Sequence, residues 1–79
     1  MSKYENFEKE VQEVEYFITN QWELFKDQAE QVLRNLSKNQ KELDQLRDFF
    51  NQKLKNRVGG ITVNAFEIAF DQIQEEDWK

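Results

Sequence analysis

The sequence predicts a small all-α domain in which one long helix is covered by two shorter helices folded back on it. Three observations lead to this fold class. Apolar residues recur every three or four positions over most of the chain, proline is absent, and the only two glycines are adjacent. With 79 residues, the chain forms a single domain with a modest core. The expected architecture is a helical hairpin or three-helix bundle that dimerisation completes.

The first helix is expected over residues 3–36. Its apolar residues stay on one face of a straight helix: Tyr4, Phe7, Val11, Val14, Ile18, Trp22, Phe25, Ala29, Val32 and Leu36. Ser2 and Glu5 have the spacing of a capping box at its start. Asn20 and Glu23 have the same spacing, so the alternative is a new helix that begins at this point. Because the stripe keeps its phase there, one continuous helix is the favoured prediction.

A second helix is expected over residues 40–57, after a short turn. Its start signal is either Asn39 with Glu42 or Ser37 with Gln40. Its apolar stripe consists of Leu43, Leu46, Phe50 and Leu54, flanked by Phe49 and Val58. Since this stripe is nearly in phase with the first, the alternative is one helix through both segments. That rod would be about 80 Å long with little to cover it, so a hairpin is favoured.

The glycine pair predicts where the second helix ends. Several cations precede it, and cations are favourable in the last turns of a helix. Gly59 is therefore expected at or beside the left-handed cap position.

A third helix is expected over residues 63–76. Thr62 is its expected N-cap, and Ile61 is expected to pack onto Phe66. One face carries Val63, Phe66, Ala69, Phe70 and Ile73. Residues 61–70 also contain side chains that suit a strand, but their apolar positions do not alternate, which favours a helix.

The amino-terminal half of the long helix carries apolar surface that the other helices are not expected to reach. They fold back along its carboxyl half, over about 27 Å and 22 Å. An exposed large apolar side chain forgoes about 1.5–3 kcal/mol, and contiguous apolar patches usually mark interfaces. We therefore predict a homodimer that buries Tyr4, Phe7, Val11, Val14 and Ile18, with a second contact edge at Phe17 and Leu24.

Charge is unevenly distributed along this acidic chain, whose net charge is −5. Residues 34–57 contain most of its cations: Arg34, Lys38, Lys41, Arg47, Lys53, Lys55 and Arg57. One interpretation is a basic helix packed between two acidic ones; the other is a patch that contacts the phosphates of a nucleic acid. The acidic total and the lack of a recognised nucleic-acid motif favour the first.

Composition excludes several chemistries. Without cysteine or histidine, the chain has no disulfide, no zinc site of the usual kind and no thiol or imidazole catalyst. It also lacks a glycine-rich phosphate loop and a nucleophile elbow. The run Glu75, Glu76 and Asp77 lacks the alternating ligands of a calcium loop, so a solvated tail is expected. We predict no catalytic residue, no metal and no cofactor.

The aromatic residues are expected in the core rather than in a ligand pocket: Trp22, Phe25, Phe49, Phe50, Phe66 and Phe70. No apolar run suits a signal peptide or a membrane span, and an acidic polar face would be repelled by anionic lipids, so a cytoplasmic protein is expected. The sequence therefore predicts a non-catalytic helical module that binds another protein as a homodimer. The alternative is a nucleic-acid-associated regulator that uses residues 34–57.

Overall fold

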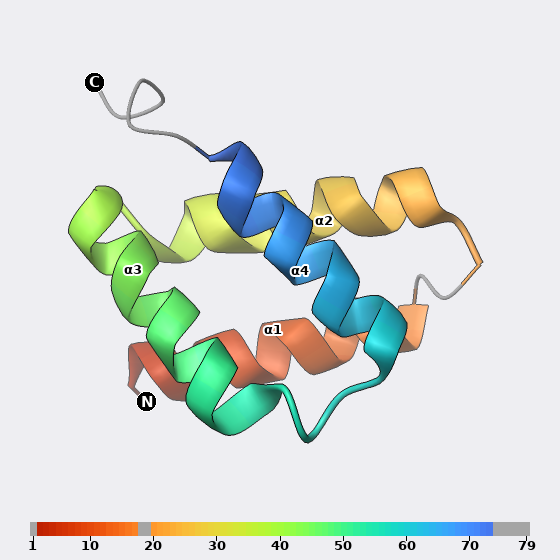
Figure 1. The fold of residues 1–79 in the computed structure, drawn as a ribbon, viewed down its shortest axis with the longest axis horizontal. Helices are drawn as coiled ribbons and strands as arrows, with labels where there is room; N and C mark the ends of the chain where they lie inside the picture. The colour runs from red at the N-terminus through yellow and green to blue at the C-terminus, as the bar shows by residue number, and fades with distance from the viewer. Residues whose placement is uncertain (1, 18–19, 74–79) are drawn as a thin grey trace.

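The computed structural model describes residues 2–17 and 20–73, and this part of the chain is helical without strands. Its elements are α1 (Lys3–Phe17), α2 (Trp22–Leu36), α3 (Gln40–Phe49), the π-helix η1 (Phe50–Leu54) and α4 (Gly60–Gln72). Figure 1 shows α1 and α2 running in opposite directions along the long axis, with α3 and α4 lying across them. The predicted all-α class is confirmed, but the number and lengths of the helices differ from the prediction.

The continuous helix predicted over residues 3–36 is wrong. α1 ends at Phe17, and α2 begins at Trp22 after an extended residue, Gln21. The alternative prediction, in which a new helix begins at Asn20, is therefore closer to the structure. However, the N-cap is Gln21 rather than Asn20, and its side chain makes no capping hydrogen bond. The capping box at the start of α1 is confirmed, because Ser2 and Glu5 exchange hydrogen bonds between side chain and backbone N–H (3.2 and 3.3 Å).

The reversal between α1 and α2 explains how the apolar stripe is covered. α1 folds back against α2 and also contacts α3, so Phe7, Val11 and Val14 are buried within one copy of the chain. On a continuous helix these side chains would extend beyond the covering helices. Burying each of the larger ones contributes about 1.5–3 kcal/mol, which favours the reversed arrangement.

Aromatic rings from three elements meet in the centre of the core. Phe7 of α1, Phe50 of η1 and Phe66 of α4 are fully buried, with ring centroids 5.5–6.3 Å apart. Phe70 packs edge-on against Phe50 at 5.8 Å. These separations are typical of favourable aromatic pairs. The prediction that the aromatic residues form the core is confirmed for Phe25, Phe50, Phe66 and Phe70, while Trp22 and Phe49 are partly buried against it. Phe7 was predicted in a dimer contact instead, and it is buried in the core of the single chain.

The start of α3 follows the predicted capping signal. Asn39 is the N-cap, and its side chain accepts a hydrogen bond from the backbone N–H of Glu42 (2.9 Å). The Glu42 carboxylate in turn accepts from the N–H of Lys38 (2.7 Å). The Ser37 hydroxyl is buried and donates to the carbonyl of Leu33 in α2. Hydrogen bonds between its own side chains and the backbone therefore stabilise the turn between α2 and α3.

The second predicted helix is interrupted earlier than residue 57. After α3, the N–H of Lys55 donates to the carbonyl of Phe50 (2.9 Å), five positions back, which is the hydrogen bond of a π-turn. The extra residue in this turn was not predicted from the sequence. Residues 55–57 then form a turn that leads to the glycines.

The predicted roles of the residues around the glycine pair need correction. Gly59 has φ −71° and ψ 161°, which is extended rather than left-handed, and it is the N-cap of α4. α4 therefore begins at Gly60 instead of residue 63, Thr62 lies within its first turn, and Ile61 is exposed. A helix rather than a strand over residues 61–70 is confirmed. The predicted extension from residue 74 to 76 lies outside the described residues.

Candidate protein-binding surface

One carboxylate ties the end of α1 to the start of α4. Oε2 of Glu15 accepts a hydrogen bond from the backbone N–H of Gly59 (2.7 Å) and another from the buried hydroxyl of Thr62 (2.6 Å). A carboxylate at this position satisfies a free N–H group and complements the positive end of the α4 dipole. Gly59 also leaves room for it, since a Cβ there would lie 3.3 Å from the same oxygen. Glu15 therefore fixes where the first turn of α4 sits against α1.

The three exposed large apolar side chains of the described chain come from helix ends on one side of the molecule. They are Tyr16 (81% exposed) near the end of α1, Leu24 (46%) in the first turn of α2 and Ile61 (44%) in the first turn of α4. Figure 1 shows these three helix ends on the same side of the molecule, opposite the α2–α3 turn. We call this region the apolar end, and the α2–α3 turn the capped end. Leu24 was predicted at a contact edge, whereas neither Tyr16 nor Ile61 was predicted at a binding surface.

The predicted self-association residues are mostly inside the monomer. Phe7 and Val11 are fully buried, Val14 is 8% exposed, and Tyr4 is partly buried with its ring stacked on Phe49 at 4.8 Å. The reason for expecting them in a dimer contact was an uncovered stripe, and α1 covers that stripe by folding back. Ile18 lies outside the described residues, and so does the side chain of Phe17. Dimerisation itself stays a prediction.

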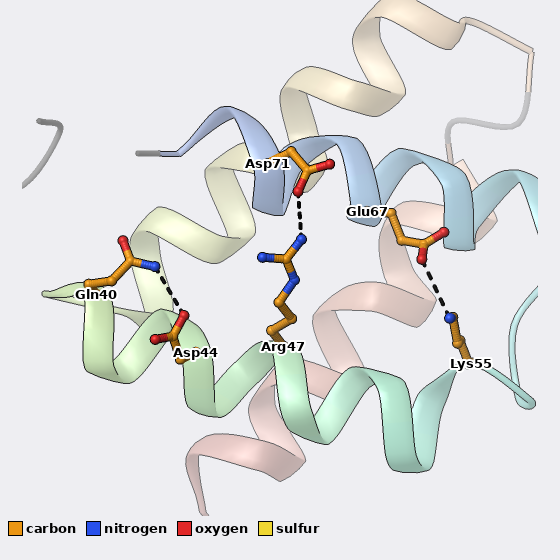
Figure 2. Close-up of polar contacts among 6 residues, drawn as sticks. All are labelled: Gln40, Asp44, Arg47, Lys55, Glu67 and Asp71. Atoms are coloured by element: carbon orange, nitrogen blue, oxygen red, sulfur yellow. Dashed lines mark hydrogen bonds and ion pairs between the residues drawn. The ribbon is translucent and has the colours of Figure 1, made fainter. Parts of the chain in front are cut away.

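Four of the predicted basic-patch residues form ion pairs with acidic side chains of the same chain. Arg47 and Lys55 pair across to Asp71 and Glu67 of α4 at 2.6 and 3.4 Å, as Figure 2 shows. Arg57 pairs with Glu8 of α1 at 3.0 Å. The fourth pair lies within α2, between Arg34 and Glu30 (2.8 Å). Three of these pairs join the middle segment to the acidic helices on either side of it.

The remaining patch residues, Lys38, Lys41 and Lys53, are exposed and form no ion pair with another described residue. They do not lie in one turn of one helix. Lys38 precedes α3, Lys41 lies in its first turn, and Lys53 follows in η1. The structure therefore disperses the cations that the sequence groups together.

Other predicted features add no further candidate site. Among the described residues, no three acidic side chains gather closely enough to hold a metal ion. Glu75, Glu76 and Asp77 lie outside the described residues. No helix in the described ranges is long and apolar enough to cross a membrane. Comparison of the chain with protein-family models, curated proteins and solved structures gives no match.

Proposed function

We propose that the chain is a non-catalytic helical module that binds another protein through its apolar end. The observation that carries this proposal is the position of Tyr16, Leu24 and Ile61. They are the exposed large apolar side chains of the described chain, and all belong to helix ends at one side of the bundle. Exposed large apolar side chains on one side of a protein are suited to binding a partner, and tyrosine is enriched at such interfaces.

In this proposal the contact region is the apolar end and no longer the apolar stripe on α1. A partner that bound the stripe would first have to open the core around Phe7 and Val11, whereas the apolar end is accessible in the folded monomer. Binding at these exposed positions also adds apolar burial without unfolding a helix. We therefore expect a modest interface, at the small end of the range seen for protein complexes.

Photo-crosslinking tests the proposal. A photoreactive phenylalanine analogue is introduced at Tyr16 or at Leu24, and at the exposed Asn35 near the other end of α2 as the control. In the producing cells, we expect the same protein to be crosslinked from the first two positions and not from the third. The purified pair should then bind, and Ile61→Gln should weaken binding without reducing helicity. Equal crosslinking from all three positions would contradict the proposal.

A further inference from the structure

Exposed carboxylates lie near Tyr16 and Leu24 along α1 and α2. Glu13 lies one turn before the end of α1, and Glu23 and Asp27 lie in the first two turns of α2. Glu23 has 82% of its side chain exposed. Neither Glu13 nor Asp27 forms an ion pair with another described residue. We call Glu13, Glu23 and Asp27, which flank Tyr16 and Leu24 in α1 and α2, the acidic rim.

Few cations lie close to these carboxylates in the sequence, and the nearest one before α4, Arg57, pairs with Glu8. Lys26 is the only lysine or arginine between residues 13 and 28, and its side chain is 22% exposed. Its ammonium group is 3.3 Å from the Glu23 carboxylate and 5.6 Å from the centre of the Trp22 ring. Both contacts hold it against its own helix. The first turns of α4 add no cation, because residues 58–73 contain no lysine or arginine.

The partial charges at the helix ends do not offset the negative charge of these carboxylates. The Glu15 carboxylate already compensates the positive end of the α4 dipole, and Glu23 does the same in the first turn of α2. The last turn of α1 contains no basic residue, so the negative end of its dipole is not offset by its own side chains. We therefore expect the apolar end to attract positive charge.

From this pattern we infer that the partner binds with a cationic amphipathic segment, in which apolar side chains are flanked by lysine or arginine. This inference rests on the proposed function. The apolar anchors would contact Tyr16, Leu24 and Ile61, while the cations would face Glu13 and Asp27 at the rim. Complementary rim charges speed association and set orientation. A second copy joined about a two-fold axis would instead bring like charges together, and nucleic acids and anionic lipids would be repelled.

Two synthetic helical peptides with the same leucine and phenylalanine anchors test the inference. One has lysine flanks and the other glutamate flanks, and each is titrated into the ¹⁵N-labelled full chain. We expect the lysine peptide to bind at least about tenfold more tightly, and its affinity to fall as salt is raised. The amide shifts should centre on Tyr16, Leu24 and Ile61. Equal affinity for the two peptides, or shifts centred elsewhere, would overturn the inference.

A matched pair of charge reversals locates the effect. Asp27→Lys at the apolar end should weaken binding of the lysine peptide about three- to tenfold. Asp48→Lys, at an exposed position of α3, changes the net charge equally and should change affinity about twofold or less. Equal losses in the two variants would overturn the inference. So would failure of both peptides to bind, or a dimer that buries these amides without peptide. The crosslinking experiment uses neither peptide, so it judges the proposed function separately.

Discussion

The two ends of α2 are built in opposite ways. Beyond Leu36, the side chains of Asn39 and Glu42 accept hydrogen bonds from backbone N–H groups of the turn. Before Trp22, the N-cap Gln21 makes no side-chain hydrogen bond, and large apolar side chains of the neighbouring helix ends are exposed. A junction that satisfies its own polar groups leaves little for a partner to bind. The junction with exposed apolar surface is the one suited to recognition.

The largest effect on stability is expected in the hydrophobic core, which connects the two ends of the molecule. Phe7→Ala removes a fully buried ring that contacts Phe50 and Phe66, and should lower the free energy of unfolding by about 3–5 kcal/mol. Urea denaturation followed by circular dichroism measures it, with the exposed Lys9→Ala as control. A loss below about 1 kcal/mol, accompanied by a halved mass in light scattering, would instead place Phe7 in a dimer contact.

How far the sequence predicts this fold differs between the two junctions. The start of α3 is predictable because its signal is local: Asn39 caps an N–H three positions away. The break after Phe17 has no such signal. The stripe keeps the same phase in one long helix and in two helices that both face the core, so periodicity cannot separate them. The contacts that do separate them are distant in sequence, such as that of Glu15 with Gly59.

The candidate surface was hard to predict for a related reason. The sequence shows which side chains are apolar, but exposure depends on which helix faces pack together. Leu24 was recognised because it lies off the main stripe, and it is exposed. Ile61 was assigned a local packing role that depended on α4 beginning at residue 63, whereas α4 begins at Gly60. The cations of residues 34–57 were predicted to be offset by the acidic helices, with an exposed patch as the alternative, and four of these seven cations pair with acidic residues of the chain itself.

A smaller effect tests how the apolar end is held together. Glu15→Ala removes the acceptor for the Gly59 N–H and the buried Thr62 hydroxyl, and should cost about 1–3 kcal/mol. The matched control is Glu13→Ala, an exposed carboxylate on the same helix, which should change stability by less than about 0.5 kcal/mol. Thermal and urea unfolding of the two variants give the comparison. Equal stability of the two would show that Glu15 does not anchor α4.

Cap substitutions sharpen the contrast between the two ends of α2. Asn39→Ala should cost about 1 kcal/mol because it removes the acceptor for the Glu42 N–H. Gln21→Ala should be nearly neutral, since no capping hydrogen bond is lost. Gln21→Asp should stabilise the protein by about 0.5–1 kcal/mol by supplying the missing cap. Equal costs for the two alanine variants would contradict the difference between the junctions.

The smallest effect is expected from the dispersed lysines. Replacing Lys38, Lys41 and Lys53 together with glutamine should change the free energy of unfolding by less than about 0.5 kcal/mol, because they form no ion pair with described residues. Partner binding at the apolar end should also persist. Retention on DNA or RNA columns at low salt provides the check. Salt-sensitive retention that the triple variant loses would support the nucleic-acid alternative instead.

The chain reverses between α1 and α2, and one distance within a single copy tests this reversal. Glu5→Cys and Asn35→Cys place spin labels near the start of α1 and the end of α2, in a chain that has no other cysteine. Electron–electron double resonance is recorded with excess unlabelled protein, so that only distances within one copy contribute. We predict a separation within the 33 Å long dimension of the molecule. A narrow distribution near about 45 Å, the length of thirty residues of straight helix, would contradict the reversal.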